Sequence, residues 1–104
     1  MNVFIPVEDV GKAVAFYGLP VKFRDGDRFA LLEGGIGLAG PAEQLTGATA
    51  FCLKVDDLPR AVQDFLERGG AVAREPEAGP HETRAVLRDP SGNLFVLYSP
   101  GGSR

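Results

Sequence analysis

Cysteine and histidine are nearly absent from this chain of 104 residues, which contains one of each, Cys52 and His81. A single cysteine excludes an internal disulfide, and one cysteine with one histidine excludes a zinc cluster built from these residue types. Hydrophobic residues make up 44% of the chain. That share is typical of a soluble globular protein, and the length allows one domain with a modest core.

Basic clusters and long apolar runs are absent as well. The eight arginines and three lysines are scattered among 14 acidic residues, and the net charge is −3. This pattern argues against a nucleic-acid partner. No apolar run approaches the roughly 18 residues that a membrane span needs, so we expect no membrane partner. The first residues are typical of a strand and not of a targeting segment, which favours a cytoplasmic location.

The sequence does contain one internal repeat. Residues 7–14 (VEDVGKAV) and 55–62 (VDDLPRAV) lie 48 positions apart, with four identical and three conservatively exchanged positions. Each copy is typical of the end of a strand, a helix cap and the first turn of a helix. A period near 50 residues, repeated once, predicts a duplicated supersecondary unit.

Both copies predict a short amphipathic helix. Asp9 and Asp57 are the expected N-caps, because a carboxylate there accepts a hydrogen bond from the first turn. Apolar residues then follow at i, i+3, i+4 and i+7. These stripes are Val10, Ala13, Val14 and Tyr17 in the first copy and Leu58, Ala61, Val62 and Phe65 in the second. We expect the two stripes to make equivalent buried contacts.

Strand-like segments surround these helices in the same order in both halves. They are expected at 2–7, 21–25, 28–32 and 36–39, and again at 49–55, 71–74, 83–88 and 94–98, with a loop at 75–80. The pattern predicts an α+β fold of two βαβββ modules: module one at 1–40, a connector at 41–47, module two at 48–98 and a frayed tail at 99–104. A ferredoxin-like sheet is the alternative, with two strands after its first helix and one after its second.

The chain resembles the vicinal oxygen chelate superfamily, which includes glyoxalase I, extradiol dioxygenases, fosfomycin-resistance transferases and bleomycin-resistance proteins. The matching segments are 7–10, 15–17 (AFY), 55–58 and 89–95 (DPSGNLF). The last is the most specific, since it places a turn before the final apolar strand. The resemblance covers residues 2–98 and implies paired modules whose strands form a curled mixed sheet with a cleft.

The resemblance also implies where a metal would bind. In metal-dependent members a divalent ion is held by a histidine on the first strand of each module and a glutamate on the last. The corresponding positions here are Asn2, Ala50 and Val96, and the segment 36–39 contains no acid. Alanine and valine cannot ligate a metal, and asparagine is a weak neutral ligand. We therefore expect no metal and no cofactor.

Strand alternation predicts which side chains line the cleft. The candidate ligand-binding residues are Phe4, Ala50, Cys52, Lys54, Val96 and Tyr98. Their neighbours in sequence are expected to pack against the helices: Val3, Ile5, Val7, Phe51, Leu53, Val55, Phe95 and Leu97. A mostly apolar cleft with Lys54 near its rim suits a planar or aromatic small molecule. The alternative is that the same residues fill a closed core or a dimer interface.

Three candidate functional groups have ordinary explanations beside the chemical ones. His81 with Glu82 could act as an acid/base pair or be a solvated loop residue. Cys52 could be a nucleophile or a small buried apolar residue. Arg84 could clamp an anion, although such an arginine more often lies at the surface.

Three functions follow from these observations. The first is a metal-independent protein that binds a small molecule, as in the bleomycin-resistance branch. The second is an enzyme of lyase or dioxygenase type with a displaced metal site, or with acid/base chemistry from His81, Glu82, Glu33 or Glu43. The third is an interaction domain without a ligand. We also expect a homodimer, because the last strand of each module would leave an edge open to pairing.

Overall fold

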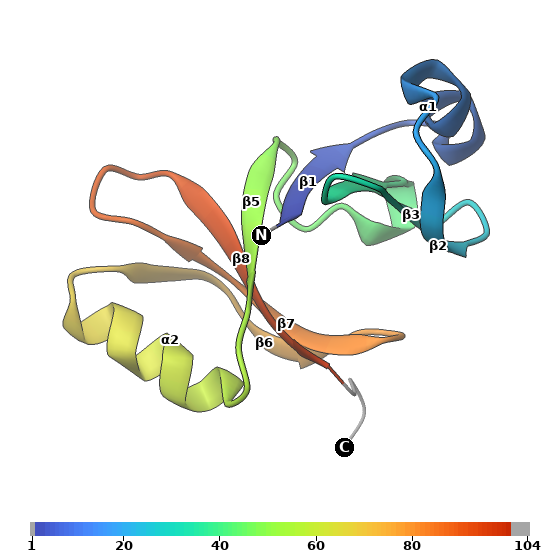
Figure 1. Cartoon of the computed structure of the whole chain (residues 1–104). Coiled ribbons are helices and arrows are strands. Elements are labelled where there is room, and N and C mark those ends of the chain that lie inside the picture. Colours follow the sequence, from blue (N-terminus) through green and yellow to red (C-terminus); the bar gives the residue numbers. More distant parts are fainter. Residues whose placement is uncertain (1, 101–104) are drawn as a thin grey trace. The chain divides into compact units, whose positions relative to one another are not determined.

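The computed structural model describes residues 2–100, which contain eight strands, two α-helices and one short 3-10 helix. These residues divide into two compact units, of which the first ends at Ala50 and the second begins at Phe51. Each unit follows the order strand, helix, three strands (Figure 1). The predicted α+β class with a duplicated βαβββ unit is confirmed, and the ferredoxin-like alternative is wrong.

The first module contains one helix and a mixed four-stranded sheet. Its elements are β1 (Asn2–Pro6), α1 (Val10–Tyr17), β2 (Val21–Asp25), β3 (Phe29–Leu32) and β4 (Ile36–Ala39), followed by the 3-10 helix Pro41–Glu43. The strand order is β2-β3-β4-β1, with β1 parallel to β4 and the other pairs antiparallel. The 3-10 helix lies in the predicted polar connector, for which no helix was expected.

Local sequence determines both ends of α1. The Asp9 side chain accepts a hydrogen bond from the Lys12 backbone N–H at 2.9 Å, as predicted for an N-cap. At the other end Gly18 adopts φ 65°, and its N–H donates to the Val14 carbonyl at 3.1 Å. A left-handed residue at this position favours glycine, which explains why the helix stops there.

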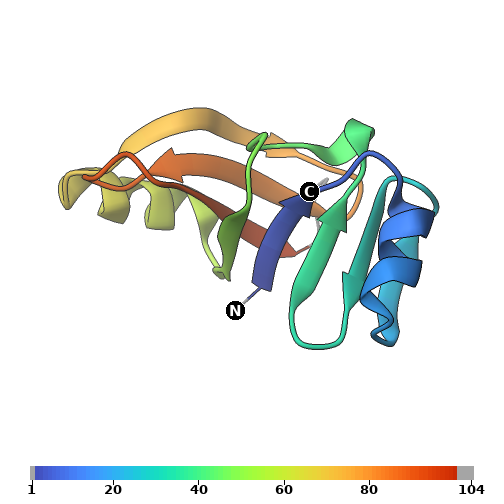
Figure 2. The same ribbon diagram turned by 90° about the horizontal axis from the view of Figure 1, so that it is seen from above.

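The core of the first module lies between α1 and the adjacent strands. Val10, Ala30, Leu32 and Leu38 are fully buried. The helix contacts β3 and β4, and it is seen beside the strands of its module in Figure 2. The burial of these aliphatic side chains supplies the main favourable free energy of this module.

The second module repeats the arrangement with longer elements. These are β5 (Ala50–Lys54), α2 (Leu58–Glu67), β6 (Ala71–Ala78), β7 (Glu82–Arg88) and β8 (Leu94–Pro100). The strand order is β5-β8-β7-β6, with β5 parallel to β8 and the other pairs antiparallel. Asp57 caps α2 as predicted, because its side chain accepts from the Arg60 N–H at 3.1 Å.

One face of this sheet packs against α2 (Figure 1). The buried cluster consists of Leu58, Val62, Ala85, Leu87, Phe95 and Leu97. Leu53, Val55 and Phe65 pack against it and are partly buried. The expectation that odd-numbered residues of β5 and β8 face the helix therefore agrees with the packing of this module.

The two helices are not equivalent, contrary to expectation. α1 has eight residues and buries only Val10, whereas α2 has ten and buries Leu58 and Val62. Val14, the counterpart of Val62, is half-buried. The early stop at Gly18 shortens the first helix, so its apolar stripe covers less of the sheet.

The predicted loop at 75–80 is wrong for residues 75–78, because β6 continues to Ala78. Its register against β7 shifts between Val72 and Arg74 and again between Arg74 and Glu77. Proline is tolerated at such irregularities of an edge strand, where no ladder hydrogen bond is lost. Pro76 therefore does not end the strand.

The last strands of the modules lie inside their sheets and not at the edges. β4 lies between β3 and β1, and β8 lies between β7 and β5. The edge-strand reason given for a dimer is therefore wrong, since each of these strands is paired on both sides. β8 also extends to Pro100, so the predicted tail begins inside a strand, and residues 101–104 lie outside the described part.

Candidate functional site

The predicted site residues of β5 and β8 lie side by side in the second module. Cys52 is opposite Val96, and Lys54 is opposite Tyr98. Because side chains alternate across a strand, these four residues point away from the face that packs on α2. We call this surface the strand face, and that it binds a ligand stays a prediction.

The strand face has a closed floor and an accessible rim. The side chains of Cys52 and Val96 are only 6% and 2% exposed, whereas Tyr98 is half-buried and Lys54 is exposed. A ligand reaching this face therefore contacts Tyr98 and Lys54 first.

The remaining two predicted site residues belong to the first unit. Phe4 lies on β1, and its ring meets the ring of Phe29 edge to face with centroids 5.7 Å apart. Phe29 also approaches Phe23 at 6.5 Å. Gly37 gives this group its space, because a Cβ there would lie 2.9 Å from the Phe29 ring. Ala50 is buried at the end of this unit.

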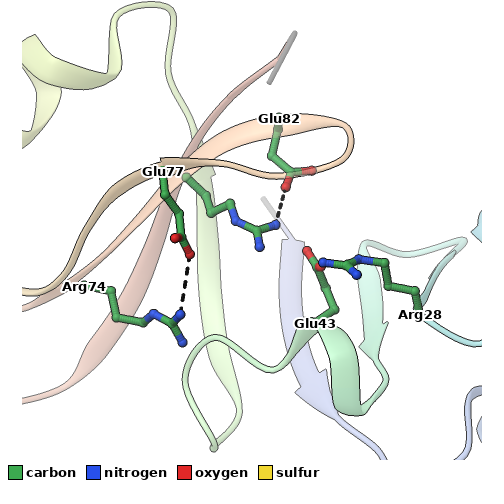
Figure 3. Close-up of polar contacts among 6 residues, drawn as sticks. Arg28, Glu43, Arg74, Glu77 and Glu82 are labelled. Carbon is green, nitrogen blue, oxygen red and sulfur yellow. Dashed lines mark hydrogen bonds and ion pairs between the residues drawn. The ribbon is translucent and has the colours of Figure 1, made fainter. Parts of the chain in front are cut away.

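Arg84 of β7 is buried, which corrects the expectation that an arginine at this position more often lies at the surface. It lies opposite Tyr98 on the strand face and is 7% exposed. Its Nη1 donates to Oε2 of Glu82 at 2.7 Å (Figure 3). Arg84 lies two residues from Val86 and therefore shares its face of the strand. This spacing indicates that Arg84 is buried only once β7 is known to be an interior strand.

Two potential acids on the strand face hold their protons. Burial raises the pKa of Cys52 to about 12, and the Glu82 carboxylate contributes in the same direction. Burial also raises the pKa of Tyr98, with further contributions from Cys52 and Glu82. At neutral pH the face therefore presents a thiol and a phenol, and the thiol is a poor nucleophile.

The residues at the superfamily's metal positions do not fit a metal. Asn2 offers a neutral amide, while Ala50 and Val96 offer no donor atom. Cys52 is nearby in sequence, but its raised pKa opposes the thiolate form that binds metals. Within residues 2–100, no three side chains of histidine, cysteine, aspartate or glutamate come together to hold an ion.

The residues proposed for acid/base chemistry are distributed over both units. Glu33 and Glu43 belong to the first, and His81 and Glu82 to the second. The Glu43 carboxylate is buried and accepts a hydrogen bond from Arg28 Nε at 2.7 Å (Figure 3). His81 and Glu33 are exposed. Glu82 is half-buried and is also bonded to an arginine, so neither the Glu43 nor the Glu82 carboxylate is arranged as an isolated base.

Hydrogen bonds within the β7–β8 turn explain the residues of its sequence motif, which begins at Asp89. Asp89 Oδ1 accepts from the backbone N–H groups of Ser91 and Asn93, both at 2.9 Å. Hydrogen bonding from the Asn93 side chain, and then from backbone N–H groups, lowers the pKa of Asp89. Asp89 thus stabilises the β7–β8 turn, as the sequence pattern indicates.

Residues 2–98 match the family described as a glyoxalase-like domain. The chain therefore belongs to this family and, with it, to the vicinal oxygen chelate superfamily. The residue pattern of the repeated modules and the final turn had indicated the same superfamily.

A protein of Mycolicibacterium smegmatis, described as uncharacterized, is 36% identical over 105 residues, which cover 94% of this chain and 90% of that protein. An NAD-dependent benzaldehyde dehydrogenase structure from Legionella pneumophila has a TM-score of 0.80 at 14% identity, covering 96% of this chain and 98% of that chain. Methylmalonyl-CoA epimerase from Mycobacterium tuberculosis gives 0.71 at 21%, covering 96% and 86%. At these identities the structures show the shared fold alone.

No helix within residues 2–100 is long and apolar enough to cross a membrane.

Proposed function

We propose that this chain is a metal-independent small-molecule-binding protein of the glyoxalase/bleomycin-resistance type. The observation that carries the proposal is the chemistry of the metal positions, where Ala50 and Val96 provide no donor atom. The neighbouring thiol of Cys52 is held protonated. A site of this composition favours binding by shape and stacking over Lewis-acid catalysis.

The proposed ligand is a planar or aromatic molecule that lies on the strand face of the second module. Its ring packs on Tyr98, above the floor made by Cys52 and Val96. A negatively charged substituent is received by Lys54, which is exposed at the rim. The guanidinium of Arg84 is already bonded to Glu82, so it supports the floor and leaves Lys54 as the more accessible cation.

Elemental analysis and native mass spectrometry test this proposal. Freshly purified protein is expected to carry far less than one Zn, Ni, Mn or Fe atom per chain and to retain an organic molecule. Stoichiometric metal that survives dialysis, and whose removal abolishes an activity, would contradict the proposal.

Ala50→Trp provides the matched structural test, because an indole there fills space beside the proposed floor. The retained molecule is expected to be lost in this variant. Thr49→Trp is the control, since Thr49 is exposed and adjacent in sequence. Thermal melts establish that both variants fold. Equal retention of the molecule in a folded Ala50→Trp variant would show that the assignment of the site is wrong.

We further propose that the protein is a homodimer. The support is a set of exposed apolar side chains on the first module, five of them within eight residues of the sequence: Phe16, Tyr17, Leu19, Val21 and Phe23. Exposed apolar surfaces on small proteins commonly mark contact sites.

A further inference from the structure

A concave surface lies on the α2 side of the sheet in the second module. It is a pocket of about 260 Å³ whose lining comes entirely from residues 51–95. The pocket includes the end of α2, the β7–β8 turn and strand β5. It opens on the face opposite the strand face, because Phe51 and Phe95 alternate with Cys52 and Val96.

Three phenylalanine rings form the apolar wall of this pocket. Phe51 lies parallel to Phe95, with an interplanar angle of 4° and centroids 5.4 Å apart. Phe65 of α2 meets Phe95 edge to face at 5.1 Å. Phe95 is buried, but Phe51 remains 37% exposed. An aromatic wall with one accessible ring favours stacking of another flat ring.

The charges around the pocket favour an anion. The guanidinium carbon of Arg68 lies 5.4 Å from the centre of the Phe65 ring, at the pocket's margin. In the part of the chain that the structure describes, Arg68 forms no ion pair with a carboxylate. Arg88 also belongs to the lining, and its side chain donates to the Gly92 carbonyl at 3.4 Å.

The negative groups near the pocket already have partners. The Asp89 carboxylate accepts hydrogen bonds from Ser91 and Asn93 within the turn. The Phe65 carbonyl at the end of α2 accepts from the N–H groups of Arg68 and Gly70, at 3.1 and 2.9 Å. These bonds reduce the repulsion that a helix C-terminus and a carboxylate would exert on an anion.

The volume limits the size of the occupant. Pockets for drug-sized ligands run from about 300 to 1,000 Å³, so this one suits a single substituted ring and not a nucleotide or a coenzyme. We propose that this aromatic pocket binds a small aromatic carboxylate, with the ring on Phe51 and the carboxylate at Arg68. The proposal is independent of the strand-face site, because the two lie on opposite faces of the sheet.

Titration of ¹⁵N-labelled protein with benzoate, and separately with neutral benzamide, tests the proposal. Benzoate is expected to shift the amide signals of Phe65 and Gly70, and to bind more tightly than benzamide. Shifts confined to Tyr98 and Arg84 would place the ligand on the strand face and overturn this inference. The absence of any saturable shift with benzoate would also overturn it.

Two variants test the named contacts. Phe51→Ala is expected to weaken benzoate binding roughly threefold to tenfold. Leu66→Ala, which truncates an exposed apolar side chain of α2 outside the lining, is expected to leave it unchanged. Arg68→Gln is expected to weaken benzoate roughly twofold to fivefold and to leave benzamide unaffected. Arg60→Gln, near the start of the same helix, is the charge-matched control.

Phe51→Leu serves as the test if Phe51→Ala perturbs the fold. Leucine keeps an apolar side chain at this position and removes only the aromatic stacking. Loss of binding in Phe51→Leu with an unchanged amide spectrum elsewhere supports the pocket. Unchanged affinity in Phe51→Leu and Arg68→Gln together would contradict it.

Discussion

Cys52 shows how burial determines chemistry at the scale of a single residue. Its thiol lies on the strand face beside Val96 and close enough to Glu82 to be affected by that charge. Both effects oppose ionisation, so the residue behaves as a small apolar group at neutral pH. The sequence predicts the face of the strand on which Cys52 lies. The burial of Cys52 and its proximity to the Glu82 carboxylate depend on contacts between residues that are far apart in the sequence.

The raised pKa predicts a loss of stability in alkaline solution. An unfolded thiol ionises near pH 9, whereas the folded one keeps its proton up to about 12. Between these values the unfolded state binds fewer protons, so the free energy of unfolding falls as pH rises, by up to about 1.4 kcal/mol per pH unit. Urea unfolding from about pH 7 to about pH 11 should show this fall.

Cys52→Ala is the control for this titration. The variant keeps the other titrating groups, including Tyr98, and should lose less stability across the same alkaline range. Parallel pH profiles of wild type and variant would show that the thiol is not responsible.

Arg84 marks the limit of sequence reasoning at this scale. The faces of Cys52, Lys54, Val96 and Tyr98 follow from a period of two residues, which any strand imposes. Burial of an arginine depends instead on which strands flank its own, and that order is set by pairing of distant segments. The sequence therefore did not predict the ion pair between Arg84 and Glu82.

At the scale of elements, the local signals were the reliable ones. Asp9, Asp57 and Gly18 each satisfy backbone groups within a few residues, so the sequence contains all the information needed. Strand β6 is different, because the pairing with β7 keeps Pro76 inside a strand although the local composition favours a loop. Elements stabilised by distant partners are the ones that local composition predicts least well.

The unequal burial of the two helices predicts unequal costs of truncation. Val62→Ala should lower the free energy of unfolding by about 1–3 kcal/mol, because it removes buried methyl groups and leaves a cavity. Val14→Ala should cost clearly less, since Val14 is only half-buried. Urea melts measure both, and equal losses would contradict the packing described for α1.

The β6–β7 hairpin predicts that Gly79 tolerates no side chain. A Cβ at this position would overlap with Nη1 of Arg84 and approach Oε2 of Glu82 at 2.8 Å. The Gly79 N–H also donates to the Glu82 carbonyl at 2.6 Å, which fixes the backbone. Gly79→Ala should therefore cost about 1–3 kcal/mol through overpacking, measured by chemical denaturation.

Gly11→Ala is the matched control for this substitution. Gly11 lies inside α1, where an added Cβ meets only ordinary contacts at 3.4 and 3.5 Å. Alanine is the better helix former, so this variant should be neutral or more stable. A Gly79→Ala variant as stable as Gly11→Ala would show that the Arg84 side chain moves aside at little cost.

At the scale of the whole molecule, the duplicated pattern made the fold predictable. A repeat at an offset of 48 residues requires two similar units, and the turn at 89–93 identifies the superfamily. The order of strands within each sheet was less accessible, because β4 and β8 each pair with a strand on the far side of a helix. The inference of open last strands failed for this reason.

The proposed homodimer is tested through the exposed apolar side chains of the first module. Phe16 is 81% exposed on α1, where its ring meets Tyr17 edge to face at 5.1 Å. Burying a phenylalanine contributes about 1.5–3 kcal/mol, and a symmetric dimer buries one ring from each protomer. Phe16→Ser should therefore weaken the dimer about 100-fold or more, measured by analytical ultracentrifugation.

Ala15→Ser, on the same exposed turn of α1, is the control and should leave the dimer intact. The variant Phe16→Ser also separates assembly from folding, because a side chain that contributes little to the core of its own module can be lost without unfolding it. Its thermal melt at a concentration where both proteins are monomeric should match that of the wild type. A wild-type protein that stays monomeric at high micromolar concentration would refute the dimer, and an unchanged dissociation constant in Phe16→Ser would assign it to another surface.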